Sequence, residues 1–329
     1  MAAIRLGTVC HQRKLSSIQM SFRLLPETGS TFPSYKAGQY IALRRDDCKL
    51  TRSAGVGTDG RPVFEPELDE SGRQKIGSVT HPYSIASAPW ETLEHGFVEF
   101  YITRDMGAHG LSGRLSEALF AMGPATSCVV TYVDRVAGTF TLDDRASGFE
   151  HVVMVASGTG LAPFISMVKQ RYFEAASARG DGRGYTLFHT NRTYEELGYH
   201  NELLEIEAAG RLDFVYVPTV SRPSGRDDAD PHLGRGRANN VVRLVLGLPV
   251  KEAEALDEAK AKASNVAQAQ AVLAKTVHPV LPRHVSGSML RDRLDPLRMV
   301  LLACGNPIST ADIKLTAKRH QIRFETEEW

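Results

Sequence analysis

Apolar and polar residues alternate along the first 145 positions of the chain. Short alternating segments recur at 39–43, 96–103 and 128–133, and clusters of glycine and proline separate them. A period of two residues is typical of strands that bury one face. We therefore expect an antiparallel barrel or sandwich in this half of the protein.

Two stretches interrupt this alternation. Residues 46–77 are polar and rich in glycine, and we interpret them as an excursion between strands that forms a hairpin of its own. Residues 112–122 follow a helical spacing that places Leu115, Leu119 and Met122 on one face.

From residue 150 onward the pattern changes. Continuous apolar runs at 151–156 and 299–303 are typical of parallel strands buried on both faces. Further strands are expected at 185–189, 213–217 and 322–325, and helices at 163–176, 193–209 and 309–320. Strands that alternate with helices indicate a doubly wound parallel sheet. The chain is thus predicted to contain two domains, 1–147 and 148–329, which suits its length of 329 residues.

Residues 224–295 exceed what a minimal doubly wound sheet requires. Within them, 251–275 contains many Ala, Glu, Lys and Gln residues and almost no helix breakers, which predicts one long helix. Its apolar positions are mostly alanine, so we expect it to cover a surface. A lid or packing helix and a docking helix for a partner are both open.

Composition and charge exclude several classes of protein. With 42% hydrophobic and 23% charged residues the chain is globular, and 39 basic against 38 acidic residues leave a net charge of +1. This balance gives no case for nucleic acid as a partner. The four cysteines form no CxxC pair, so neither a bound metal nor a disulfide framework is expected. No apolar run reaches the ~20 residues of a membrane span, and we expect a cytoplasmic protein.

A glycine-rich turn follows the apolar run at 151–156. It reads Ser157-Gly158-Thr159-Gly160-Leu-Ala-Pro163 and leads into a predicted helix. Glycine lets the backbone approach phosphate oxygens at a helix start, where free amides favour an anion. A triphosphate-binding loop is excluded because no Lys-Ser/Thr pair follows, and Pro163 replaces the third glycine of a Rossmann fingerprint. Taken alone, the turn fits a nucleotide site or simply a tight connection.

The segment at 81–87, His-Pro-Tyr-Ser-Ile-Ala-Ser, precedes this turn. Together, the two segments resemble the flavin motif RxYSxAS and the nucleotide turn GTGxxP of the ferredoxin–NADP reductase family. The resemblance implies an N-terminal antiparallel Greek-key barrel that binds FAD and a C-terminal parallel-sheet domain that binds NADP. It covers nearly the whole chain apart from 46–77 and 224–295.

The resemblance assigns FAD contacts to two segments of the first domain. Tyr83 packs on the isoalloxazine and Ser84 forms a hydrogen bond near N5, while His81 stands where the family has an arginine on the flavin phosphates. Arginine binds phosphate better than a neutral histidine, so this contact is weakened here. Ile85 belongs to the same motif. A second segment resembles the family's LSxRL motif and would hold the pyrophosphate; it comprises Leu111, Ser112 and Gly113.

NADP contacts are implied for four segments of the second domain. The residues concerned are Gly158, Thr159, Gly160, Pro163, Arg192, Ser221, Arg222, Cys304 and Gly305. Arg192 and Arg222 follow predicted strands and suit the 2′-phosphate that separates NADPH from NADH, although each would also fit a surface ion pair. Cys304 resembles the thiol beside the nicotinamide, and packing is the alternative.

The chain ends in Glu327-Glu328-Trp329. By resemblance, Trp329 covers either the flavin ring or the adenine, and Glu327 joins Ser84 and Cys304 as a catalytic residue. The implied activity is hydride exchange between NADPH and FAD, with ferredoxin or flavodoxin as the electron carrier. Alternatives are the reductase subunit of an oxygenase and a regulatory module that binds the nucleotides without turnover.

Overall fold

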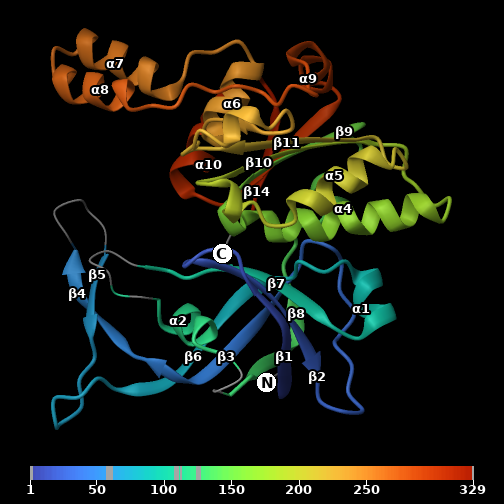
Figure 1. Ribbon diagram of the computed structural model, residues 1–329, viewed down its shortest axis with the longest axis vertical. Coiled ribbons are helices and arrows are strands. Elements are labelled where there is room, and N and C mark those ends of the chain that lie inside the picture. The colour runs from blue at the N-terminus through green and yellow to red at the C-terminus, as the bar shows by residue number, and fades with distance from the viewer. Residues whose placement is uncertain (1–2, 57–61, 107–110, 112, 124–126, 328–329) are drawn as a thin grey trace. The chain divides into compact units, whose positions relative to one another are not determined.

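The computed structural model describes residues 3–56, 62–106, 111, 113–123 and 127–327. The chain divides into two compact units (Figure 1). The first contains residues 1–141 and 165–167, and the second contains 142–164 and 168–329. Each unit has its own sheet and its own core.

The first unit is an antiparallel sheet in the order β6-β3-β8-β1-β2-β7. Its principal elements are β1 (Ile4–Lys14), β2 (Gln19–Pro26), β3 (Tyr40–Lys49), β6 (Ile76–Ser84), α1 (Pro89–His95), β7 (Val98–Thr103), α2 (Arg114–Phe120) and β8 (Val129–Ala137). Just beyond β6, Ile85 forms an antiparallel bridge with Phe100 of β7, which joins the two outer strands. The antiparallel architecture predicted from the alternating pattern is confirmed.

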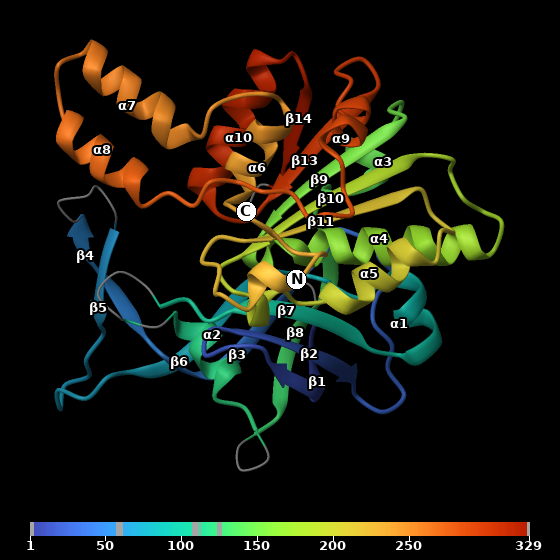
Figure 2. The same cartoon turned by 45° about the horizontal axis from the view of Figure 1, so that its top comes forward.

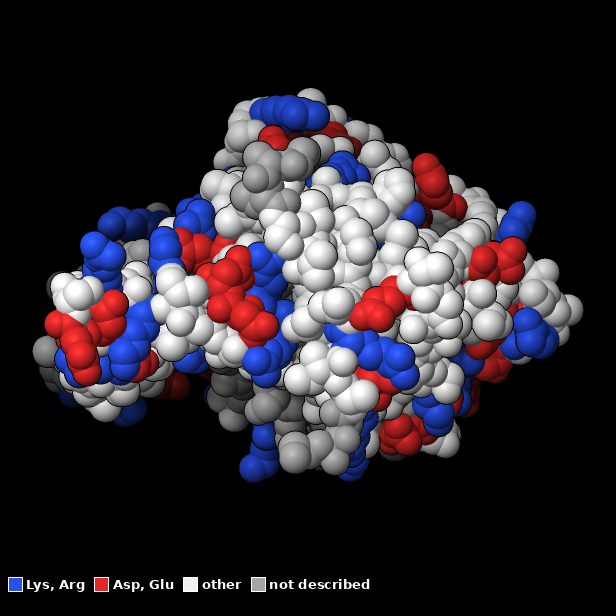
Figure 3. Space-filling model, turned by 90° about the horizontal axis from the view of Figure 1, so that it is seen from below, with Lys and Arg blue, Asp and Glu red and all other residues white. Residues whose placement is uncertain are grey.

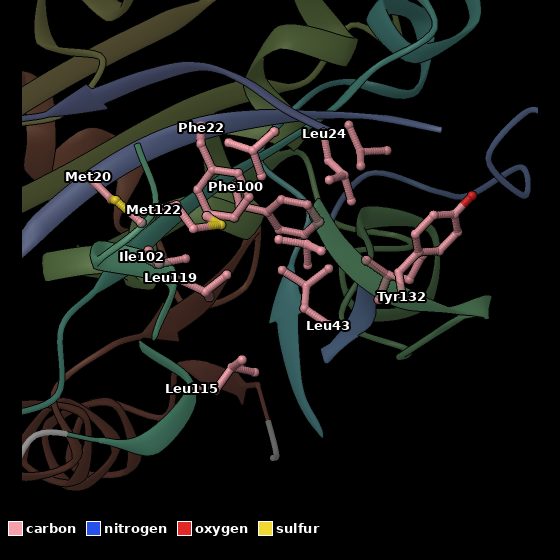
Figure 4. Packing of buried hydrophobic residues seen from close by; sticks show 14 of the residues in the cluster. Met20, Phe22, Leu24, Leu43, Phe100, Ile102, Leu115, Leu119, Met122 and Tyr132 are labelled. Carbon is pink, nitrogen blue, oxygen red and sulfur yellow. The ribbon is translucent and has the colours of Figure 1, made fainter. Parts of the chain in front are cut away.

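The core of this unit lies on one face of the sheet and beneath α2 (Figure 4). Phe22 of β2 and Phe100 of β7 pack with their ring centroids 5.3 Å apart. Leu115, Leu119 and Met122 are all buried, so the helical face expected for this segment is confirmed. The excursion contains a two-stranded hairpin of β4 (Thr51–Val56) and β5 (Pro62–Pro66), as the polar, glycine-rich sequence indicated.

The second unit is a parallel sheet in the order β12-β11-β10-β9-β13-β14. Its strands are β9 (His151–Ser157), β10 (Gly184–Asn191), β11 (Phe214–Val220), β12 (Gly234–Arg235), β13 (Met299–Cys304) and β14 (Arg323–Thr326). The order reverses between β9 and β13, which is the switch point where doubly wound sheets bind ligands. Every residue of β13 is buried, as its apolar run predicted, and every residue of β10 and β11 is buried as well.

Helices cover both faces of the parallel sheet (Figures 1 and 2). Helices α4 (Leu161–Ala176) and α5 (His200–Ala208) lie on one face. On the other face lie α6 (Ala238–Val245), α9 (Gly287–Arg293) and α10 (Pro307–Arg319), whose apolar side chains share a core with β9 and β13. The short α3 (Leu142–Arg145) precedes β9.

The single long helix predicted for 251–275 is wrong. The structure has two helices, α7 (Lys251–Ala261) and α8 (Val266–Ala274), which fold back on each other. The chain turns because Ala263 and Asn265 adopt left-handed backbone conformations, with φ of 50° and 57°. Leu256 is the one buried residue of α7 and none of α8 is buried. The alanine-rich face thus lies at a surface, as expected.

Lys, Arg, Asp and Glu side chains are interspersed on the face shown in Figure 3. This mixture agrees with the net charge of +1. Among the described residues, no helix is both long and apolar enough to cross a membrane.

Candidate functional site

The flavin segment predicted in the first unit begins at the end of β6. Strand pairing places Tyr83 opposite Ile41 and Ser84 opposite Tyr40 of β3. Tyr83 is half-buried, and this burial raises the pKa of its phenol, which therefore stays neutral at physiological pH. Ser84 and Ile85 are buried, whereas His81 is exposed with its ring 5.5 Å from that of Tyr83. The exposed surface of the segment is thus formed by an imidazole and a phenol.

The second flavin segment leads into α2, which packs against β3 and β6. Gly113 is the residue before the helix, and its amide donates to the carbonyl of Asp105 at 2.6 Å. A Cβ at Gly113 would lie 2.7 Å from the Cβ of Asp105, so only glycine fits. Ser116, which the sequence did not indicate, accepts from the amide of Asp105 and donates to Gly113 O. Leu111 is half-buried, and Ser112 lies outside the described residues.

In the second unit, the glycine turn connects β9 to α4 at the carboxyl edge of the sheet. Gly158 has a φ of 59°, in the left-handed region that favours glycine. Thr159 and Gly160 complete a short 3₁₀ turn. Pro163 lies in the first turn of α4, where its missing N–H leaves no helical bond unmade. The strand, turn and helix predicted for this segment are therefore confirmed.

Gly160 and Gly305 allow this turn to lie in close contact with the loop that follows β13. A Cβ at Gly160 would lie 2.3 Å from the carbonyl oxygen of Cys304. A Cβ at Gly305 would lie 2.3 Å from the carbonyl oxygen of Ser157, and Gly305 itself has a φ of 128°. The Asn306 amide also donates to the Ser157 hydroxyl at 2.7 Å. Two backbone segments thus meet at the switch point of the sheet.

The Cys304 thiol lies beside the carboxylate of Glu327. Parallel pairing of β13 with β14 sets Ala303 opposite Thr326, so the next residues of the two strands are neighbours. The sulfur of Cys304 donates to Oε2 of Glu327 at 3.1 Å. Burial, followed by the negative charge of Glu327, raises the pKa of the Cys304 thiol well above its ordinary value. The side chain is therefore a protonated thiol at neutral pH and not a thiolate nucleophile.

Arg192 and Arg222 follow β10 and β11, and the Arg222 amide donates to the Arg192 carbonyl at 2.8 Å. Arg192 forms a two-pronged ion pair with Glu196, with distances of 2.7 and 3.0 Å. Glu196 was not among the predicted site residues, although its spacing of four residues from Arg192 was a signal. Ser221 is half-buried, and Arg222 is exposed without an ion pair among the described residues.

A further arginine lies over a tyrosine near this edge. The guanidinium of Arg226 is 5.0 Å from the ring centroid of Tyr194. Below it, Tyr194 packs against a small core that includes Val220, the last residue of β11. Neither Arg226 nor Tyr194 was among the predicted site residues.

The fold can now be compared with known proteins. Residues 154–246 match the model of the oxidoreductase NAD-binding domain. A ferredoxin–NADP reductase of Azotobacter vinelandii is 25% identical over 224 residues, which are 65% of this chain and 69% of that protein. A solved ferredoxin NADP⁺ reductase of Neisseria gonorrhoeae with bound FAD and NADP has a TM-score of 0.57 at 18% identity, and the match covers 99% of both chains.

This chain has the fold of the ferredoxin–NADP reductase family. The suspected resemblance and the predicted two-part architecture are both confirmed. The same fold occurs in the cytochrome P450 reductase GcoB of Amycolatopsis, with a TM-score of 0.56 at 17% identity; the match covers 100% of this chain and 71% of that one.

Other relatives of this reductase fold belong to oxygenase systems. The ferredoxin–NAD⁺ reductase component of a Xanthobacter autotrophicus alkene monooxygenase system is 30% identical over 182 residues, which are 55% of this chain and 48% of that protein. A self-sufficient cytochrome P450 monooxygenase of Aspergillus niger is 26% identical over 133 residues, or 40% of this chain. The match spans only about an eighth (12%) of the length of that monooxygenase.

Within this reductase fold, the predicted nucleotide residues gather at one edge of the parallel sheet, and the predicted flavin residues of β6 and α2 lie in the other unit. Trp329 lies outside the described residues. Among the described residues, no group of three His, Cys, Asp or Glu side chains is arranged to hold a metal ion.

Proposed function

We propose that this protein is an FAD-dependent NADPH oxidoreductase that exchanges electrons with ferredoxin or flavodoxin. The observation that supports this most strongly is the pair of glycines at the switch point. Gly160 and Gly305 let the turn after β9 pack backbone to backbone against the loop after β13, and Cys304 is the residue that precedes Gly305. Helix α4 begins directly after this turn, and the amides at a helix start suit a pyrophosphate.

The proposed tasks of the chain's own residues follow from their chemistry. Bound FAD would supply the acceptor for a hydride and would release its electrons singly. Tyr83, as a neutral phenol, would pack on a flavin ring, and Ser84 would donate a hydrogen bond to it. The Cys304 thiol is kept protonated by burial and oriented by Glu327, so it would present a weakly polar surface to a nicotinamide ring without reacting with it.

The remaining predicted contacts belong to the same proposal. His81 and Ile85, with Leu111, Ser112 and Gly113, would complete the FAD site, and Trp329 would cover a ring of one cofactor. Since an exposed histidine, His81, stands where the motif has an arginine, we expect the protein to retain FAD weakly. A test is the visible flavin absorption of the purified protein and its recovery on adding FAD. A protein that shows no flavin absorption after incubation with FAD and removal of the free FAD would refute the enzyme and favour a non-catalytic module.

The proposed preference for NADPH over NADH rests chiefly on Arg222 after β11, because Glu196 already pairs with Arg192 after β10. Arg222 is exposed and unpaired among the described residues, so its guanidinium is available to a 2′-phosphate. We expect Arg222→Ala to raise KM for NADPH far more than KM for NADH. Equal increases for both nucleotides would contradict this role.

The electron acceptor has a second candidate. Relatives that belong to alkene and cytochrome P450 monooxygenase systems favour a reductase component of an oxygenase. NADPH-driven reduction of a panel of ferredoxins, flavodoxin and free flavins separates the two. Fast reduction of flavodoxin or several ferredoxins supports the first proposal, whereas reduction of one iron–sulfur partner alone favours the second.

A further inference from the structure

The arginines at the carboxyl edge of the parallel sheet are not equivalent. Arg192 is held by both carboxylate oxygens of Glu196, whose side chain is only 7% exposed. This contact raises the pKa of the Arg192 guanidinium and occupies two of its donors. A phosphate that approached Arg192 would also approach the charge of Glu196. Arg192 therefore contributes little net attraction for a second anion.

Arg226 has the opposite surroundings. Its guanidinium lies over an aromatic ring, with its Cζ 5.0 Å from the centroid of Tyr194. Among the described residues it forms no ion pair, and the two aspartates that follow it are engaged elsewhere. Asp227 accepts from the amide of Ser224 at 2.6 Å, and Asp228 pairs with Arg235 at 2.6 Å. The positive charge of Arg226 is thus not neutralised.

The position of Arg226 is also fixed from below. Tyr194 packs on the core formed by Leu197, Val220 and Leu233 and meets the ring of His200 edge-on, at 5.4 Å and 78°. The loop that carries Arg226 is tied by Asp227, which is 6% exposed. An aromatic ring accepts no N–H···O hydrogen bond and carries no charge, so the Arg226 guanidinium over Tyr194 keeps N–H donors for an anion.

We propose that Arg226, positioned by Tyr194, determines specificity for the 2′-phosphate of NADPH together with Arg222, and that Arg192 is a positioning residue for the turn it shares with Glu196. This inference rests on the proposed nicotinamide function and extends it to a residue outside the predicted motifs. Arg222 and Arg226 both follow β11 in the chain, and Tyr194, which lies under Arg226, packs against Val220 at the end of that strand.

Calorimetric binding of adenosine 2′-monophosphate and adenosine 5′-monophosphate tests the proposal without any turnover. We expect the wild-type protein to prefer the 2′ isomer and Arg226→Gln to weaken that isomer about tenfold, the loss of one charged contact. The 5′ isomer should change less than about twofold, since it lacks the group that Arg226 binds. Arg226→Lys keeps the charge and loses the planar fork, so its effect should be intermediate.

Two further variants separate the roles of the arginines. Arg192→Gln should affect both isomers alike and weakly, and Glu196→Gln should strengthen the 2′ isomer because it releases Arg192. Arg211→Gln is the matched control, since Arg211 also lies over a tyrosine, at 5.6 Å from Tyr172, but precedes β11 and so belongs to the amino edge of the sheet.

The proposal is overturned if the wild-type protein shows no preference for the 2′ isomer, or if Arg226→Gln leaves binding unchanged or weakens both isomers equally. Flavin reduction by NADPH and NADH is measured in parallel. If neither nucleotide reduces the flavin, the proposed oxidoreductase function fails, while the two adenosine phosphates still decide the role of Arg226.

Discussion

Arg243 connects the insertion to the sheet through a buried ion pair, and its loss should be costly. The residue is 1% exposed and lies on α6, and Asp312 of α10 is also 1% exposed. Two hydrogen bonds of 2.8 Å join them, a third of 2.8 Å reaches Glu254 of α7, and a fourth of 3.2 Å reaches the carbonyl of Pro249. One side chain thus joins α6, α7 and α10.

The magnitude follows from what each substitution leaves behind. Arg243→Met removes the guanidinium and leaves the buried carboxylate of Asp312 with Asn239 at 2.8 Å and Lys251 at 3.2 Å, which costs at most about 3–5 kcal/mol. For a unit of this size that corresponds to a decrease in Tm of roughly 6–20 °C. Asp312→Asn leaves the guanidinium with Glu254 as its remaining carboxylate partner and should also be destabilising. The double variant removes both charges and keeps an acceptor for Asn239, so it should be more stable than the sum of the single effects predicts.

Differential scanning calorimetry of the three variants measures this coupling. Arg319→Met is the matched control, because Arg319 also pairs with Glu254 but is 41% exposed, and exposed pairs contribute about 1 kcal/mol or less. Additive effects in the double variant would refute the buried ion pair as the anchor of the insertion. So would a control that is as destabilised as Arg243→Met.

The same pair predicts an acid limit. Burial by itself would raise the pKa of Asp312, but the hydrogen bonds from Arg243 and Asn239 outweigh it and hold that pKa below its ordinary value. Since the carboxylate has a lower pKa in the folded state, its contribution is complete above about pH 4, the unfolded value, and is lost as the pH falls further. In Asp312→Asn this part of the acid transition should be absent.

Three further outcomes are expected. Gly305→Ala should weaken binding of NADP⁺ at least about tenfold, because its Cβ would overlap Ser157; the control Gly247→Ala also has a positive φ, of 72°, but open space around its Cβ, and equal losses would contradict the backbone contact. Cys304→Ser should slow hydride transfer in stopped flow with FAD content unchanged, and the wild-type thiol should react slowly with iodoacetamide at pH 8; rapid labelling would argue against its raised pKa. Burial lowers the pKa of His189 to about 3, so the unfolded chain binds an extra proton below pH 6.5 and stability falls as the pH is lowered, by about 1.4 kcal/mol per pH unit; urea titrations of His189→Gln between pH 6.5 and 5 should show a shallower slope.

The periodic pattern of apolar residues predicted most of the strands and helices. The strands at 151–157 and 299–304 could be located because residues buried on both faces form unbroken apolar runs. The break within 251–275 could not, because alanine and lysine favour helix and the turn depends on left-handed conformations at Ala263 and Asn265.

In the candidate site, too, features with a local sequence signal could be predicted and features that depend on tertiary packing could not. The glycine turn at 158–160 could be predicted because glycine is the residue that adopts backbone conformations other residues avoid. The pairing of Arg243 with Asp312, 69 residues apart, depends on how α6 and α10 pack and left no local signal. Tyr194 and Arg226 were missed for a similar reason, since their contact arises only when the ends of two strands come together.

The backbone contact between the turn after β9 and the loop after β13 has a consequence for engineering. Neither segment can be exchanged alone, because each needs a glycine where the backbone of the other comes close. Gly160 lies against Cys304, and Gly305 lies against Ser157. A graft that brings in a new turn without its companion loop would force the two chains apart. Segment exchanges between reductases of this fold should therefore replace both segments together, although they lie far apart in the sequence (160 and 305).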